Sequence, residues 1–139
     1  MSTDPVRDLL TSHHLGTLAT IRRSGRPQLS VVTHAFDGQR EVIRVSTAAD
    51  RAKTANLRRD PRATYLVMNP HGWGYAVADC RAELLPVTTA VDDASADELV
   101  DIYRAISGEH PDWDEFRAAM IIERRLPVHL HVERLNGWL

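Results

Sequence analysis

Hydrophobic and polar residues alternate through the first third of the chain, which is the pattern of half-buried β-strands. Two short turns interrupt the alternation: Arg22–Arg26, which contains Gly25, and Asp37-Gly38, a dipeptide typical of hairpins. Proline opens the second run, at a position that strands tolerate. The pattern therefore predicts three successive hairpin-linked strands, at Leu15–Ile21, Pro27–Phe36 and Glu41–Thr47.

Later in the chain this period gives way to the 3.6-residue period of helices. Apolar side chains recur at helical spacing ahead of Gly108, which is placed as a C-cap: Leu99, Ile102, Tyr103 and Ile106. Asp112 opens a further helix, with Glu115 at the capping-box position. In total we expect helices at residues 3–14, 50–60, 92–107 and from 112 onward, and further strands at Ala63–Met68, Trp73–Leu85 and Pro127–Leu135.

These elements favour a mainly β (α+β) fold. The expected architecture is a six-stranded antiparallel β-barrel with peripheral helices, in a single domain of residues 1–139. A doubly wound parallel sheet would need long helical crossovers between its strands, and the substantial helices come only late in the chain. A barrel also removes the unpaired edges of an open sheet.

Composition narrows the function classes. The 139 residues are 43% hydrophobic and 26% charged, which is ordinary for a globular protein, and the net charge of −2 argues against nucleic acid as a partner. No apolar run approaches the roughly 20 residues that span a bilayer, so we expect a cytoplasmic protein without membrane insertion. Cys80 is the one cysteine, which excludes an intrachain disulfide and a cysteine-based zinc cluster.

The stretch Ser46–Ala63 holds the candidate chemistry. It follows a β-branched run and continues, without glycine, as a short helix that Asp50 or Thr47 would cap. Pro61 would end this helix at the preceding residue, because a residue before proline avoids the α conformation. The order is therefore strand, turn and short helix.

The start of that helix suits an anion. The first turn of a helix presents unpaired N–H groups, and Arg51 and Lys53 lie in or beside it, with the hydroxyls of Ser46 and Thr47 nearby. Lys53 is the only lysine among 17 basic residues, which favours a specific need for an ammonium group. The alternative, a solvated helix face, is the more common fate of such charges. A phosphate group is the predicted guest.

Four stretches, in this order and spacing, resemble the FMN-binding split β-barrel family related to pyridoxamine 5′-phosphate oxidase. They are Leu15-Gly-Thr-Leu-Ala-Thr-Ile21, Gly25-Arg-Pro-Gln-Leu-Ser30, Arg51-Ala-Lys-Thr-Ala-Asn-Leu-Arg-Arg-Asp-Pro-Arg-Ala63 and Gly72-Trp-Gly-Tyr-Ala-Val-Ala78. The stretch Gly108-Glu-His-Pro-Asp-Trp-Asp-Glu-Phe-Arg117 is similar to the actinobacterial branch that binds the deazaflavin coenzyme F420. The resemblance covers nearly the whole chain.

The resemblance implies a homodimer with cofactor sites in grooves between the subunits. The cofactor ring would rest on the second and third strands, near Pro27, Gln28, Ser30, Ser46 and Thr47. The phosphate would meet Arg51 and Lys53, with Thr54 and Asn56 beside them. Trp73 and Tyr75 would approach from the partner subunit, although their spacing alone suits core aromatics equally well.

The resemblance also implies a function: an F420-dependent oxidoreductase that passes a hydride from the reduced deazaflavin to a small electron-poor organic acceptor. No side chain is assigned as a catalytic acid or nucleophile. An FMN-dependent oxidoreductase of the pyridoxamine phosphate oxidase type and a non-catalytic F420-binding or carrier protein stay open. F420 is favoured over FMN because its acidic tail would meet additional arginines: Arg22, Arg23, Arg26, Arg58, Arg59 and Arg62.

One histidine pair also invites a metal. His129 and His131 are two residues apart on a predicted strand and so share a face. The sequence offers no evident third ligand, so we expect histidines at the rim of the barrel and no metal site.

Overall fold

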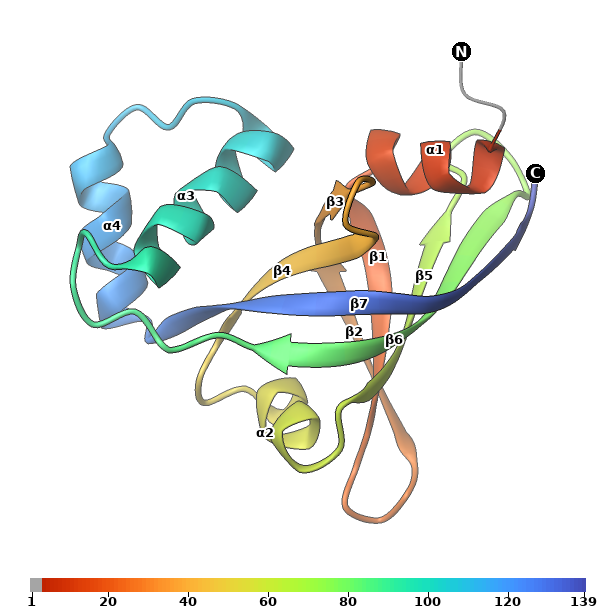
Figure 1. Ribbon diagram of the computed structural model, residues 1–139, viewed down its shortest axis with the longest axis horizontal. Helices are drawn as coiled ribbons and strands as arrows, with labels where there is room; N and C mark the ends of the chain where they lie inside the picture. The colour runs from red at the N-terminus through yellow and green to blue at the C-terminus, as the bar shows by residue number, and fades with distance from the viewer. Residues whose placement is uncertain (1–3) are drawn as a thin grey trace.

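One antiparallel sheet of seven strands, curled into a split barrel, forms the body of the protein in the computed structural model, which describes residues 4–139 (Figure 1). Its strands follow the order β2-β1-β5-β6-β7-β4-β3. Their bounds are β1 (Leu15–Ile21), β2 (Pro27–Thr33), β3 (Ala35–Asp37), β4 (Val42–Ala48), β5 (Arg62–Met68), β6 (Tyr75–Leu84) and β7 (Arg125–Trp138).

The core fills the interior of this barrel. Alternation along each strand sends every second side chain inward, and in β1 these are Gly16, Leu18 and Thr20, all buried. Apolar side chains from the other strands meet them there: Ile43, Val45, Tyr65, Val67, Ala76, Ala78, Leu126, Val128 and Leu130. Their burial supplies the hydrophobic stabilisation that holds the sheet in its curled form.

The two edge strands, β2 and β3, are consecutive pieces of the chain, separated by His34 alone. The sequence predicts one strand over Pro27–Phe36, and the structure divides it at this histidine, so the sheet has seven strands where six are expected. The two edges of the sheet are thus joined covalently, through the chain at His34. No ladder of backbone hydrogen bonds pairs β2 with β4 in residues 4–139, and a split remains between these two strands.

His34 is fully buried and is held from three directions. Its Nε2–H donates to the Leu10 carbonyl at 2.9 Å, and its Nδ1 accepts from the Tyr65 hydroxyl at 2.6 Å. Its backbone N–H donates to the carbonyl of His14 at 2.8 Å. Burial lowers the pKa of His34 to about 4, so the imidazole is neutral at physiological pH.

Tyr65 reaches His34 because β1 has no side chain at the position where the tyrosine ring lies. A Cβ atom at Gly16 would lie 2.4 Å from the Cζ atom of Tyr65, which is closer than any Cβ contact allows. Glycine is therefore required at residue 16 for the tyrosine to lie across the barrel interior and present its hydroxyl to His34.

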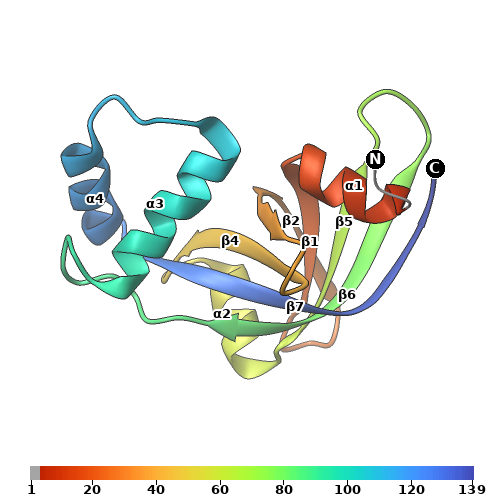
Figure 2. The same ribbon diagram turned by 45° about the horizontal axis from the view of Figure 1, so that its top comes forward.

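Four helices surround the barrel: α1 (Pro5–Ser12), α2 (Ala52–Arg59), α3 (Ala94–Ser107) and α4 (Trp113–Ile122). α1 lies over one end of the barrel, and α3 and α4 form a pair at its side, away from α1 (Figures 1 and 2). Asp93 and Asp112 cap α3 and α4 by accepting backbone N–H bonds, and Gly108 ends α3 with a positive φ of 80°. None of the helices in the described residues is long and apolar enough to cross a membrane.

The fold class expected from the sequence is confirmed, and the differences lie in the bounds of its elements. β1 has the predicted bounds, whereas the last strand, expected at Pro127–Leu135, runs from Arg125 to Trp138. The first helix, expected over residues 3–14, spans Pro5–Ser12, and Thr3 lies outside the described residues. Asp4, the other predicted cap, does accept a hydrogen bond from the backbone of Arg7.

The neutral His34 predicts a dependence of stability on pH. Its pKa is about 4 in the folded protein against an ordinary value of 6.5, so the unfolded chain binds more protons between these values. The stabilisation is complete above pH 6.5 and is lost as the pH falls toward 4. We expect urea denaturation to show a loss of about 2 kcal/mol from this group between pH 7.5 and pH 5.

Two variants isolate the contribution of His34 to the pH dependence of stability. His34→Gln should be less stable at pH 7.5, yet lose about 2 kcal/mol less than the unmodified protein on acidification. His71→Gln, which changes an exposed turn histidine, should keep the full dependence. The same acid sensitivity in His34→Gln as in the unmodified protein would show that other groups are responsible.

Candidate functional site

The split between β2 and β4 forms a groove of about 320 Å³. One wall comes from β1 and β2, the other from β4, and the floor near the end of β4 is closed by the start of α2 and of β7. The lining residues are Leu15, Val31, Val32, Thr33, Ser46, Thr47, Ala48, Arg51, Lys53 and Arg125. The structure thus brings four predicted site residues together in one groove: Ser46, Thr47, Arg51 and Lys53.

The helix at the end of this groove starts without a side-chain cap. Arg51 occupies the N-cap position, and no side chain accepts a hydrogen bond from the first turn of α2. The prediction that Asp50 or Thr47 caps this helix is therefore wrong. The Thr47 hydroxyl instead bonds to that of Thr54 at 3.1 Å, because both side chains turn into the interior. The Thr54 N–H donates to the Arg51 carbonyl at 3.1 Å, so in this first turn the N–H groups of Ala52 and Lys53 remain available to an anion.

Positive charge gathers at this helix start. Arg51 and Lys53 form no ion pair within the described part of the chain, whereas Arg125 pairs with Glu123 at 3.0 Å. Burial, and then the nearby charges of Arg51 and Arg125, lower the pKa of Lys53 below its usual value. An anion between these cations would relieve their mutual repulsion.

Sequence reasoning missed Arg125. It opens β7, nearly 80 positions after Ser46, and reaches the groove because it pairs with Ala48 in the β4–β7 ladder. No local motif marks it as a binding residue, since the contact depends on the register of two distant strands.

Three further predicted residues support the groove from behind. The Thr54 hydroxyl donates to the Ala48 carbonyl at 2.8 Å and fixes the turn into α2. Asn56 is buried, and its amide N–H₂ donates to the Gln28 side chain at 2.9 Å and to the Thr20 hydroxyl at 3.1 Å. These bonds tie α2 to the hairpin of β1 and β2. They hold the helix start in place, and they occupy the polar groups of Thr54 and Asn56.

The remaining predicted residues of β2 lie farther along that strand. Ser30 of β2 pairs with Leu18 of β1. The Leu18 side chain lies in the core, so Ser30 also faces the inside of the barrel. Pro27 opens β2 and lines a separate hollow near Arg62 and Cys80. The structure therefore does not place Pro27 in the groove with Lys53.

Trp73 and Tyr75 lie at the other end of β5 from α2. Trp73 is in the β5–β6 turn and is 86% exposed, and Tyr75 begins β6 (Figure 1). β5 leads from α2 to this turn, so the length of a seven-residue strand separates them from Lys53. Within one chain they do not contribute to the groove.

Several large apolar side chains lie exposed on the outer face of the sheet. The strand register places Leu29 and Val31 of β2 on the face that Met68, Tyr75 and Trp138 occupy on β5, β6 and β7. Leu29 is 68% exposed and Val31 is 71% exposed. We call this set, with Leu15, the outer apolar face. It continues into the groove through Leu15 and Val31.

A second hollow, of about 340 Å³, adjoins the groove and is mostly apolar. The two share Thr33, Ser46 and Arg125, so they lie next to one another. Its other lining residues come from the helix pair: Leu99, Ile102, Tyr103, Ile106, Ser107, Phe116 and Met120.

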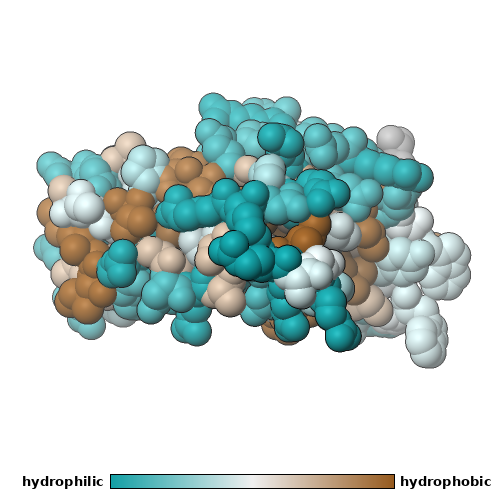
Figure 3. Space-filling model, turned by 90° about the horizontal axis from the view of Figure 1, so that it is seen from below, coloured by the Kyte–Doolittle hydropathy of each residue, from teal (hydrophilic) through white to brown (hydrophobic). Residues whose placement is uncertain are grey.

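Further arginines lie on the β1–β2 hairpin and at the end of α2. Figure 3 views the molecule from the side of α2 and the β1–β2 hairpin, and hydrophilic side chains cover much of the middle of this face. Arg22, Arg23, Arg26 and Arg58 are exposed and form no ion pair within residues 4–139. Arg62 is neutralised by Asp60 at 2.8 Å, and Arg59 donates to the Ile21 carbonyl. Four of the six predicted arginines are thus available to a ligand.

Comparison with known proteins assigns a family to this arrangement. The family model described as pyridoxamine 5′-phosphate oxidase matches residues 2–138 of the chain.

Three solved structures are similar in fold. Rv2991, a conserved hypothetical protein from Mycobacterium tuberculosis, gives a TM-score of 0.76 at 24% identity, over 99% of this chain and 84% of its own. An F420 reductase gives 0.75 at 21% identity, over 97% and 98%. HutZ, the heme storage protein from Vibrio cholerae, gives 0.72 at 14% identity, over 100% and 95%.

Proposed function

The chain belongs to the pyridoxamine 5′-phosphate oxidase family, and on that premise we propose that it is an oxidoreductase that uses coenzyme F420. The cofactor, when reduced, supplies a hydride, and the acceptor is a small electron-poor organic molecule. The observation that carries the proposal is the groove itself, where unpaired Arg51 and Lys53 meet the uncapped start of α2. The F420 reductase of similar fold supports the choice of cofactor.

The donor set of the groove fits a phosphodiester. Arg51 and Lys53 supply charge, the first turn of α2 supplies N–H groups, and Ser46 supplies a hydroxyl on the facing strand. Thr47, Thr54 and Asn56 hold the turn and the helix in position through the hydrogen bonds described above. In this proposal the ring lies along the groove between Ser46 and the Gln28–Ser30 side of β2.

The surrounding charge favours F420 over FMN. FMN ends in one phosphate, whereas F420 continues into a tail with several carboxylates. Arg58 lies in the last turn of α2, and the β1–β2 hairpin beside that turn carries Arg22, Arg23 and Arg26; in this proposal these exposed arginines attract the tail. Each exposed ion pair contributes only about 0.2–1 kcal/mol, but several together bias the choice and steer encounter.

We also propose that two copies associate through the outer apolar face, which runs into the groove at Leu15 and Val31. In such a homodimer Trp73 and Tyr75 of the partner subunit would cover the cofactor ring. Monomeric proteins rarely expose so many large apolar side chains on one face. The acceptor would enter the adjoining apolar hollow beneath α3 and α4, which excludes water from the hydride-transfer site.

Two alternatives have support of their own. The name of the family favours FMN as the cofactor. The similarity in fold to a heme storage protein favours a carrier without turnover. Mixing the protein and reduced F420 with a panel of quinones, conjugated ketones and tetrapyrroles separates the reductase from the carrier: a reductase oxidises the cofactor with at least one of them, and a carrier only binds it.

The choice of cofactor predicts a salt-sensitive preference. Titration followed by fluorescence quenching should show tighter binding of F420 than of FMN at low ionic strength. The difference should shrink as salt rises, because screening weakens the arginine–tail attraction more than the contacts inside the groove. Tighter binding of FMN at low salt, or a protein purified yellow with FMN, would refute the preference.

Lys53→Ala should weaken F420 binding by about 1.5–3 kcal/mol, the range for a hydrogen bond to a charged group. Lys53→Arg should restore only part of the affinity, since a guanidinium does not reproduce the geometry of an ammonium. Arg134→Ala, which removes an exposed cation of β7 outside the groove, serves as the matched control and should bind normally. If circular dichroism shows Lys53→Ala to be misfolded, the lysine is structural instead.

The dimer predicts a mass of twice the 15.6 kDa chain by light scattering. Val31→Asp should shift the protein toward the monomer, because it buries a charge within the proposed contact. Val91→Asp changes an equally apolar, exposed residue away from that face and should leave the dimer intact. A monomer that still binds F420 with full affinity would rule out a shared site.

A further inference from the structure

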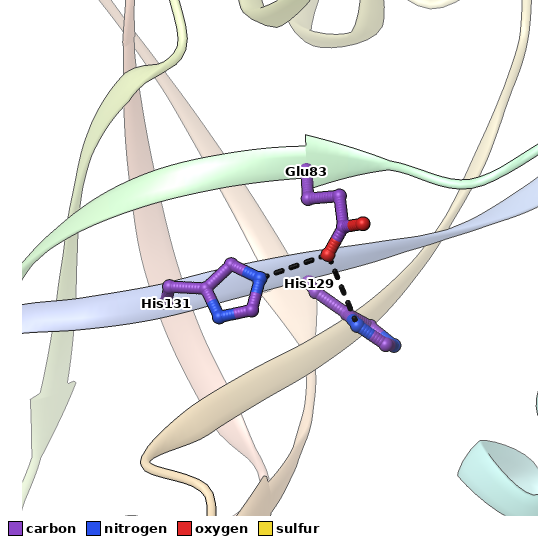
Figure 4. A group of neighbouring side chains, drawn as sticks. All are labelled: Glu83, His129 and His131. Atoms are coloured by element: carbon purple, nitrogen blue, oxygen red, sulfur yellow. Dashed lines mark hydrogen bonds and ion pairs between the residues drawn. The ribbon is translucent and has the colours of Figure 1, made fainter.

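Two histidines and a glutamate converge on the outer face of the barrel, apart from the cofactor groove. His129 and His131 project from β7, and Glu83 lies directly opposite His129 on β6 (Figure 4). One ligand atom from each of the three lies within 4.8 Å of the other two. The sequence shows the histidine pair but not the third ligand, because Glu83 is 46 positions away and is brought in by strand pairing.

The spacing is close to that of a tetrahedral metal site. The Nε2 atom of His131 is 2.9 Å from Oε1 of Glu83, and Nδ1 of His129 is 3.7 Å from the same oxygen. Ligands at about 2.0–2.2 Å from Zn²⁺ stand roughly 3.3–3.5 Å apart. Small rotations of Glu83 and His131, both exposed, bring the atoms to that separation.

A fourth residue orients His129 for this role. Glu98 of α3 accepts from Nε2 of His129, at 2.7 and 2.8 Å to its two oxygens. A carboxylate can only accept, so Nε2 carries the proton and, in the neutral ring, the lone pair is on Nδ1, the atom nearer Glu83. A carboxylate behind a metal-binding histidine fixes the tautomer and the ring orientation in the same way.

The charge of the surrounding hollow permits a cation. It is about 360 Å³ in volume, and its charged lining consists of Asp37, Glu83 and Glu98 against Arg40 and Arg44, which leaves a negative balance. Arg40 lies beside Asp37 at 3.9 Å.

We propose that Glu83, His129 and His131 bind one divalent transition-metal ion of the zinc class, with Glu98 as a positioning residue and water at the fourth position. Imidazole ligands favour Zn²⁺, Co²⁺ and Ni²⁺ over Mg²⁺ and Ca²⁺, which prefer oxygen. The site is independent of the proposed use of F420.

Isothermal titration of the full-length, tag-free protein with zinc chloride at pH 7.5 tests the proposal. One zinc ion per chain should bind, and magnesium should not compete. His131→Ala and Glu83→Gln should each weaken binding at least tenfold, and Glu98→Gln should weaken it by about 10–100-fold through loss of ring orientation. Cobalt should give the visible spectrum of a tetrahedral site, which His131→Ala abolishes.

His71→Ala is the matched control, because His71 is an exposed histidine in the β5–β6 turn, and it should bind zinc normally. Circular dichroism of each variant checks the fold, and because His131 is exposed its substitution should leave the core intact. The proposal is overturned by an absence of binding heat, by equal affinities in His131→Ala and the unmodified protein, or by half a zinc ion per chain, which would place the ion between two copies.

Discussion

The buried contact between His34 and Tyr65 is the constraint on which the barrel depends. The imidazole lies where β2 ends and β3 begins, and both ring nitrogens are satisfied, one by the tyrosine hydroxyl and one by the carbonyl of Leu10. A polar ring can occupy the core only on that condition, because an unpaired buried group is costly. Helix α1, strand β5 and both sheet edges meet at this residue, and Gly16 makes room for the tyrosine.

The barrel is closed by the covalent link between β2 and β3, and within residues 4–139 no backbone hydrogen bonds pair β2 with β4 along the split. The groove exists for this reason, and the end of β4 delivers the chain directly into the uncapped start of α2. Arg51 and Lys53 therefore stand at the mouth of a preformed hollow. Their positive charges have no carboxylate partner within the described residues, and in the proposed function a ligand phosphate supplies the counter-charge.

The helix pair of α3 and α4 meets the outer face of β4 and β7 in two places. Toward one end it covers the apolar hollow that adjoins the groove, and toward the other Glu98 reaches His129. Arg44 and Ser46, two residues apart on β4, line the histidine-containing hollow and the groove respectively, so they point to the same side of the sheet. Whatever fixes the position of α3 on the sheet also shapes the wall of the proposed acceptor pocket.

The sequence by itself determined the strands, the helices and the cationic segment that includes Lys53, because alternation, capping and proline act over a few neighbouring residues. The break at His34 escaped this reasoning, since the local pattern continues through it and its cause is burial against distant elements. Only the tertiary structure brought Arg125 to the groove and Glu83 to His129. Strand register makes both contacts, and register follows from packing of the whole sheet rather than from any short stretch of chain.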